Sequence, residues 1–146
     1  FVDNPKKQIK RLSSRIRRLC RRAHPYQPVI VLYSIPDRDV GGHSKGGLEP
    51  YQYSDYITEI CKGIGNYKPI IILEPDAVPH MRKMSFYKRQ KRTRIIKNAI
   101  NKLSKTNAHI YLDIGHPNWL KRKDAITFAF RCMQDWRELN EKGDDS

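Results

Sequence analysis

Cysteine is scarce in this chain, and the spacings that would indicate a metal centre are absent. The 146 residues contain three cysteines, Cys20, Cys61 and Cys132, an odd number spread widely along the sequence. Two of them fall at apolar positions of helical patterns, which is typical of buried free thiols. The five histidines form no HxxxH pair and do not pair with cysteines. The sequence therefore predicts neither a disulfide framework nor a zinc site.

Long apolar runs are also missing. No segment approaches the roughly 20 residues that a membrane-spanning helix needs, and the first ten residues lack the apolar stretch of a signal peptide. The chain starts without methionine in a strand-like FVD, so a leader or a further domain could precede it. These features leave the compartment open.

Acidic residues are few compared with basic ones. The chain has 29 Lys and Arg against 15 Asp and Glu, a formal net charge of +14. The cations concentrate in residues 6–22 and 82–102, which otherwise resemble amphipathic helices. A solvated outer face explains this pattern, and such a surface would also attract polyanions without sequence preference. No motif that reads bases is visible, so nucleic-acid binding is retained only as an alternative.

Periodicity predicts an α/β fold in one domain. Apolar residues at helical spacing indicate four helices, and four apolar segments, each before one of these helices or between two of them, indicate strands. The order βαβαβαβα requires a parallel sheet, and four such units make about half of a barrel of about 250 residues. The expected helices contain residues 5–23, 53–60, 95–103 and 125–139, and the expected strands are 1–3, 28–35, 69–74 and 109–113. We expect strand 28–35 to be covered on both faces.

Three aspartates stand where the last three strands end. Asp39, Asp76 and Asp113 follow one another at equal intervals of 37 residues, about the length of one strand with its returning helix. Parallel strands would gather them at one edge of the sheet, where ligands bind in α/β folds. Taken singly, each aspartate is better explained as a helix cap than as a functional group. Three at one edge favour a functional site.

Other residues near these strand ends add chemistry. Glu74 and Asp76 flank a proline on one rigid turn, where two carboxylates held close would raise the pKa of one of them. A carboxyl that keeps its proton near neutrality is what a general acid requires. Trp119 offers a flat face that could stack on a sugar ring, with His116 and Asn118 beside it. A lone tryptophan is also a common core residue.

Three segments resemble a known enzyme family. VLYSIPDRD at 31–39, ILEPDAVP at 72–79 and YLDIGHPNWL at 111–120 are similar, in this order and spacing, to the signatures of glycoside hydrolase family six. The resemblance implies cleavage of β-1,4-glucan with inversion, a distorted (β/α) barrel of which about four strands are present, and no cofactor or metal. It implies a partial catalytic domain over residues 1–140, followed by a polar tail at 141–146.

The resemblance also implies roles for individual residues. Asp76 would protonate the leaving glycosidic oxygen, and Asp39 would modulate that acid and help to organise the water. Lys45 stands in the glycine-rich loop where the family usually has a small residue, which places a long cation beside this water. The residues implied to contact the glucan are Tyr33, Arg38, Lys45, Asp113, His116 and Trp119.

Three functional hypotheses remain at this point. The first is an enzyme of the family-six type that hydrolyses cellulose or a related β-glucan, and its extracellular location would follow from the resemblance alone. The second is a family-six-like domain that binds glucan or regulates a larger polypeptide without hydrolysis. The third is the basic nucleic-acid-binding domain.

Overall fold

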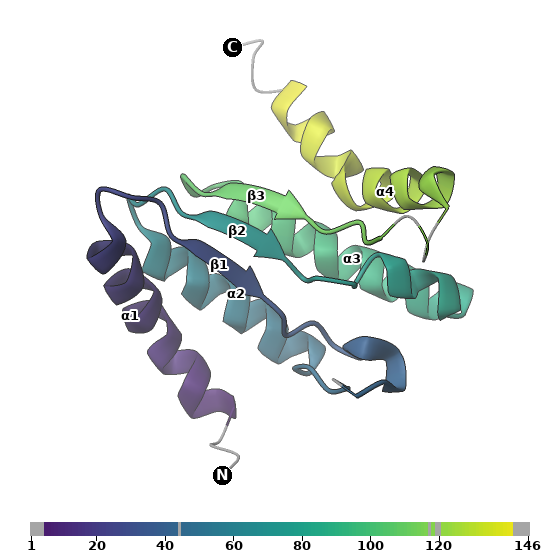
Figure 1. The fold of residues 1–146 in the computed structure, drawn as a ribbon, viewed down its shortest axis with the longest axis horizontal. Coiled ribbons are helices and arrows are strands. Elements are labelled where there is room, and N and C mark those ends of the chain that lie inside the picture. The colour runs from purple at the N-terminus through teal and green to yellow at the C-terminus, as the bar shows by residue number, and fades with distance from the viewer. Residues whose placement is uncertain (1–4, 44, 117, 119–120, 142–146) are drawn as a thin grey trace.

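The computed structural model describes residues 5–43, 45–116, 118 and 121–141. Short strands alternate with longer helices along this part of the chain (Figure 1). The elements are α1 (Pro5–Ala23), β1 (Val29–Leu32), the 3-10 helix η1 (Asp39–Gly41), α2 (Pro50–Ile64), β2 (Ile70–Leu73), the 3-10 helix η2 (Pro79–Lys83), α3 (Phe86–Leu103), β3 (His109–Leu112) and α4 (Arg122–Glu141).

The strands form a parallel sheet in the order β1-β2-β3. Val29 pairs with Ile70, and Ile70 with His109, so all three strands run in step. Their carboxyl ends therefore lie at one edge of the sheet, as the α/β prediction requires. Three of the four predicted strands are confirmed, and the predicted strand at residues 1–3 lies outside the described residues.

Capping residues explain where two of the helices begin. Glu49 precedes α2 and forms a capping box with Gln52, whose side chain accepts a hydrogen bond from the Glu49 N–H at 3.1 Å. Pro50 occupies the first turn of α2, where its missing N–H costs no hydrogen bond. Ser85 caps α3 by accepting a hydrogen bond from the Lys88 N–H. The helix predicted at residues 5–23 is confirmed as α1.

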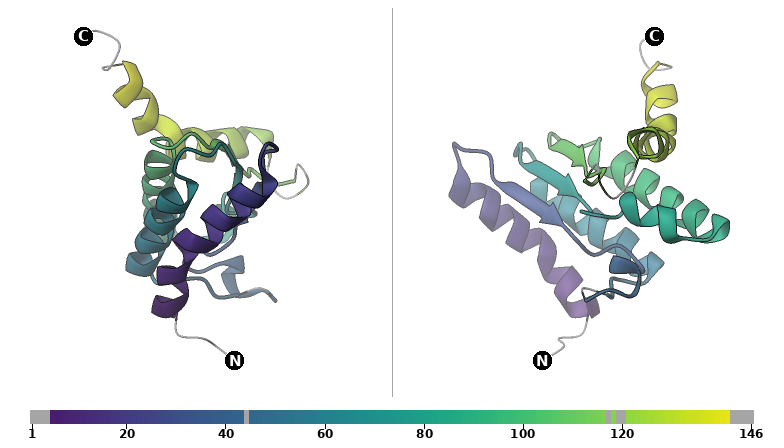
Figure 2. Two further views of the ribbon diagram at one scale, coloured as in Figure 1. Left: turned by 90° about the vertical axis from the view of Figure 1, so that its left-hand side faces the viewer. Right: turned by 45° about the vertical axis from the view of Figure 1, so that its right-hand side comes forward.

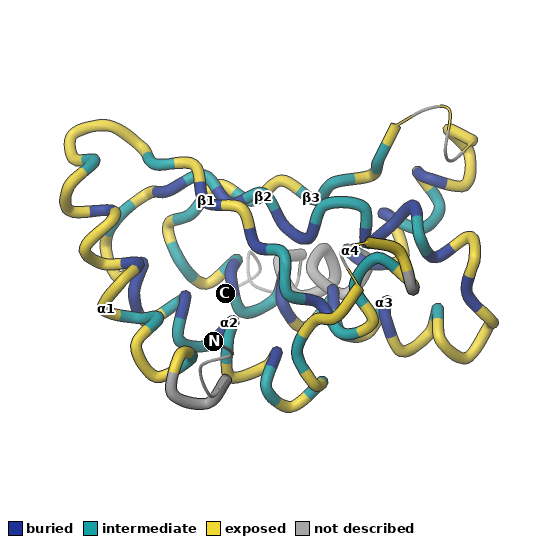
Figure 3. Tube along the Cα trace, turned by 60° about the horizontal axis from the view of Figure 1, so that its bottom comes forward, coloured by how far each residue is buried: buried dark blue, intermediate teal, exposed yellow. Residues whose placement is uncertain are grey.

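Helices cover one face of the sheet. Figures 1 and 3 show α1, α2 and α3 on the same side of the strands, and the buried strand residues Ile30, Ile71 and Leu73 belong to the core on that side. On the other face Val31 is 56% exposed and Tyr111 is 59% exposed. The prediction that strand 28–35 is covered on both faces is therefore wrong: only alternate residues of β1 are buried.

The last helix packs beside the third. Ala125, Ala129 and Cys132 of α4 are buried, and the helix extends away from the body of the molecule towards its C-terminal end (Figure 2). Cys20, Cys61 and Cys132 are all free, and only Cys61 is partly exposed. The prediction of free rather than disulfide-bonded thiols is confirmed.

Candidate active site

The turn after β1 carries Asp39 on strained backbone. The φ angles of Asp37, Asp39 and Val40 are 54°, 59° and 40°, in the left-handed region that costs a non-glycine residue of the order of 1–3 kcal/mol. The Arg38 N–H donates a hydrogen bond to the Gly46 carbonyl at 2.9 Å, which closes the loop on itself. Strain of this kind is typical of functional sites.

Arg38 holds this turn against the end of β1. Its Nη1 donates a hydrogen bond to the Tyr33 carbonyl at 2.7 Å, and its guanidinium carbon lies 4.7 Å from the centre of the Tyr33 ring. Gly42 leaves room for the Asp39 carboxylate, because a Cβ at residue 42 would lie 2.3 Å from an oxygen of that group. The position of the Asp39 carboxylate thus depends on having no side chain at Gly42.

Asp113 joins the turn after β3 to the turn after β2. Its Oδ2 accepts a hydrogen bond from the Asp76 N–H at 2.7 Å, and its Oδ1 accepts one from the Gly115 N–H at 3.2 Å. Gly115 has a φ of 81°, and a Cβ there would lie 2.0 Å from Cγ of Pro79. Glycine at this position allows the two turns to meet.

His80 joins the turn after β2 to the turn after β1. Its ring atom Nε2 lies 3.7 Å from Oδ1 of Asp39. Its backbone N–H donates a hydrogen bond to the Asp76 carbonyl at 3.1 Å. Together with the contact of Asp113, this brings the segments that carry all three predicted aspartates to one edge of the sheet.

A cleft opens beside these turns. It has a volume of about 630 Å³ and is lined by Pro79, His80, Arg82, Lys83 and Asn118. Arg82 and Lys83 are exposed, so this wall of the site is polar and basic. The cleft is within the 300–1,000 Å³ range of small-molecule sites, and it adjoins the aspartate turns through His80.

The described residues show neither a metal-binding cluster nor a membrane-spanning helix. Among the described residues, no group of three or more His, Cys, Asp and Glu side chains is placed to hold a metal ion. In the same part of the chain, no helix combines the length and apolar character needed to cross a membrane.

Comparison with known proteins identifies the family. A model of the family described as Glycosyl hydrolases family 6 matches residues 2–142. This chain belongs to that family. The resemblance of its three strand-end segments is therefore confirmed, and with it the glycoside hydrolase assignment at the level of the family.

Curated relatives of this family 6 chain are named as endoglucanases and exoglucanases. It is 39% identical over 94 residues to endoglucanase A of Cellulomonas fimi, an alignment that covers 64% of this chain and 20% of the relative. It is 33% identical over 111 residues to a probable exoglucanase of Podospora anserina, covering 66% of this chain and 26% of the relative. The chain thus spans about a fifth to a quarter of these relatives.

Solved structures confirm the fold. The endoglucanase Cel6 of Mycobacterium tuberculosis, in complex with methyl-cellobiosyl-4-deoxy-4-thio-β-D-cellobioside, matches with a TM-score of 0.79 and 28% identity over 83% of this chain and 43% of its own. The CcCel6A catalytic domain, complexed with p-nitrophenyl β-D-cellotrioside, matches with a TM-score of 0.71 and 20% identity over 87% of this chain and 42% of its own. The family 6 chain has the fold of part of these domains.

The predicted site residues separate into three groups. Tyr33, Arg38, Asp39, Asp76 and Asp113 lie on the three connected turns. Lys45 and His116 are exposed. The Lys45 N–H donates to the Gly42 carbonyl at 3.2 Å, and Nδ1 of His116 accepts from the Asn118 N–H at 3.2 Å. Trp119 lies outside the described residues.

Beneath the turns lie two buried polar side chains, those of Glu74 and Arg92, of which the sequence analysis named only Glu74. Glu74 is fully buried, and its carboxylate accepts hydrogen bonds from the N–H groups of Ser34 at 2.9 Å and Ile35 at 3.0 Å. Arg92 is 3% exposed, and its guanidinium donates to the carbonyls of Ala77, Pro36 and Asp37 at 3.2, 2.9 and 2.7 Å. Both side chains therefore fix the turn after β1, and Arg92 also fixes the turn after β2.

The Glu74 carboxyl has an unusual pKa. Burial raises this pKa from 4.5 to about 7, while the N–H groups of Ser34 and Ile35 and the charge of Arg92 act in the opposite direction. The sequence analysis expected repulsion between Glu74 and Asp76 to raise one pKa on this turn. That cause is wrong, because desolvation of Glu74 is the largest contribution.

Proposed function

We propose that this chain contributes the acid side of a family 6 active site that hydrolyses β-1,4-glucan with inversion. Asp76 is the general acid that protonates the leaving oxygen, and Asp39 is its neighbour that modulates the acid and orients the water. The observation that carries the proposal is the linkage of the turns, with Asp113 bound to the Asp76 N–H at 2.7 Å and His80 beside Asp39 at 3.7 Å.

The remaining roles concern the substrate. Tyr33 would contact the sugar at the point of cleavage. Arg38 would pair with the acids and contact the substrate, and Lys45 would lie beside the water. Asp113, His116 and Trp119 would line the glucan-binding side. Inversion needs a second carboxylate about 6.5–9.5 Å from the acid, so that a water fits between them. None of the residues named here acts as this base, and the resemblance to the family implies no metal or cofactor.

Two features support cellulose or a related β-glucan as the substrate. The curated relatives are endoglucanases and exoglucanases, and the solved relatives carry cello-oligosaccharide derivatives. Family membership favours glucan over nucleic acid as the polymer that this chain meets. An extracellular location is part of this proposal, and it rests on membership of the family alone.

The test is hydrolysis of a soluble cello-oligosaccharide by the purified chain, with an α-1,4-linked glucose oligosaccharide of equal length as the control substrate. We expect shorter cello-oligosaccharides to appear and the control to stay intact. Binding of the cello-oligosaccharide without cleavage would instead support a glucan-binding domain that has lost hydrolysis. If the chain neither binds nor cleaves the cello-oligosaccharide, the proposal is refuted.

A further inference from the structure

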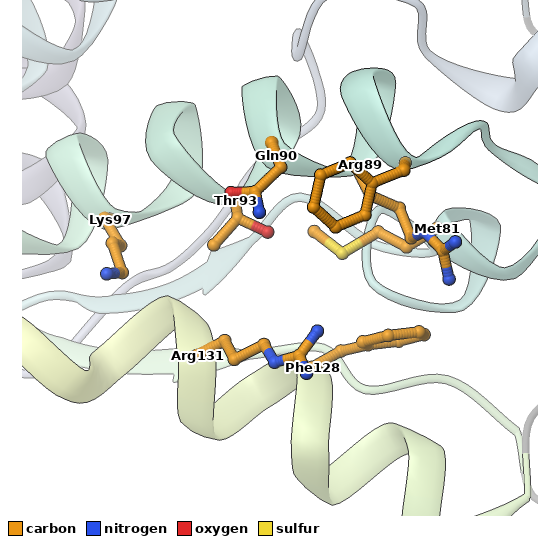
Figure 4. A pocket seen from close by; sticks show the side chains of 8 residues that line it. Met81, Arg89, Gln90, Thr93, Lys97, Phe128 and Arg131 are labelled. Carbon is orange, nitrogen blue, oxygen red and sulfur yellow. The ribbon is translucent and has the colours of Figure 1, made fainter.

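A second cleft lies between α3 and α4, and its lining differs from that of the aspartate turns. Its volume is about 400 Å³ (Figure 4). In Figure 4, side chains from α3 face those of α4 across the opening. The lining residues are Met81, Phe86, Arg89, Gln90, Thr93, Lys97, Phe128 and Arg131.

The charges in this cleft have one sign. Arg89, Lys97 and Arg131 bring three cations from two helices to one opening, and the described lining contains no carboxylate. Like charges repel most strongly where the surroundings are partly desolvated. A bound anion would attract all three cations and so offset the repulsion between them.

Arg89 adds an independent observation that also indicates a ligand. Its Nε is buried and has no hydrogen-bond acceptor in the described structure. A buried N–H without an acceptor costs free energy, because folding removes the water that would otherwise accept its hydrogen bond. An oxyanion within reach of this guanidinium would supply the missing acceptor.

We propose that the cleft binds a small molecule that carries a phosphate monoester. A phosphate monoester has a charge of about −1.5 to −2 at pH 7 and three acceptor oxygens, which suits three cations better than one carboxylate would. Arginine presents paired donors that match phosphate geometry. Phe86 and Phe128 supply apolar surface for the rest of the molecule, and Gln90 and Thr93 supply further hydrogen-bonding groups.

The cleft between α3 and α4 is distinct from the proposed glucan site. Apart from Met81, which follows His80 in η2, none of its lining residues belongs to the segments of the three aspartate turns, and glucan is not required for the binding. The proposed hydrolysis can fail while the phosphate site stands, and the reverse also holds.

The experiment is a titration of the purified chain with phenyl phosphate, followed by phosphorus NMR at about 50 mM salt, where charge contacts are only partly screened. Arg131 is exposed on α4, so Arg131→Gln should fold normally. We expect this variant and Arg89→Gln each to lower the affinity about tenfold, the loss of one charge-assisted contact. Arg22→Gln is the matched control, because Arg22 is an exposed arginine of α1. Figure 1 shows α1 on the β1 side of the sheet and α4 on the β3 side.

Three results would overturn the proposal. The first is no phosphorus shift in the unmodified chain up to about 10 mM ligand, a concentration that detects even weak binding. The second is an equal loss of affinity in Arg22→Gln, which would trace the binding to the overall charge of the chain. The third is binding of inorganic phosphate as tight as that of phenyl phosphate, which would leave the two phenylalanines without a role and make the ligand a free anion.

Discussion

Replacing Asp76 with asparagine is expected to lower kcat on a cello-oligosaccharide by about 10²–10⁴-fold, the usual contribution of a positioned general acid. The amide has nearly the shape of the carboxyl group but cannot give a proton to the leaving oxygen. The backbone N–H of residue 76 is unchanged, so its 2.7 Å hydrogen bond to Asp113 should persist. KM should therefore change much less than kcat.

The matched control for this variant is Asp55→Asn. Asp55 is an exposed aspartate on α2, and its replacement removes one carboxylate from the surface of a helix. We expect kcat to stay within about twofold of the unmodified chain, because surface substitutions away from the site have small effects. Equal activity of Asp76→Asn and Asp55→Asn would exclude Asp76 as the acid.

Replacing Glu74 with glutamine is expected to change how stability depends on pH. Burial raises the pKa of Glu74 from 4.5 to about 7, so between these values the folded chain holds a proton that the unfolded chain releases. Its contribution to stability is therefore full below about pH 4.5 and is lost as the pH rises through 7, a loss of about 3 kcal/mol. Glutamine does not ionise, so this loss is absent from the variant. As the pH rises through this range, the unfolding free energy of the variant should therefore increase by about 3 kcal/mol relative to that of the unmodified chain.

Urea unfolding of both chains between about pH 4.5 and pH 8 measures this difference. Groups that titrate alike in both chains cancel in the comparison. Glu59→Gln serves as the control, since Glu59 lies on α2 and pairs with Lys62 at 2.6 Å on the surface. The difference in unfolding free energy between Glu59→Gln and the unmodified chain should vary by less than about 1 kcal/mol over this pH range. If the difference in unfolding free energy between Glu74→Gln and the unmodified chain stays constant with pH, the raised pKa of Glu74 is contradicted.

The strand positions and the edge that carries the aspartates were predictable from sequence. Continuous β-branched runs locate β1 and β2 within a few residues, and the apolar segment HIYL locates β3. Parallel connection brings the ends of these strands together. The exposed second face of the sheet was not predictable in the same way. A run such as VIVL reads as buried on both faces, although Val31 is 56% exposed in the structure.

The polar residues that organise the site were harder to find. Arg92 lies on the same helical stripe as Ile96 and Leu103, and this single cation at an apolar position was the available signal. Its partners are carbonyls of residues 36, 37 and 77, which no local pattern reveals. His80 approaches Asp39 only because two turns meet in space. Contacts between distant segments depend on the tertiary structure, so they produce no regular residue spacing that could be recognised in the sequence.

The stereochemistry of the first product tests the proposed mechanism most directly. Proton NMR of the anomeric hydrogens, recorded from the start of cello-oligosaccharide cleavage, shows which anomer forms before mutarotation. We predict that the α-anomer appears first, because inversion at a β-linkage gives an α-product, and that Asp76→Asn releases it at least about 10²-fold more slowly. A β-anomer as the first product, or release by Asp76→Asn at the rate of the unmodified chain, would contradict the proposed mechanism.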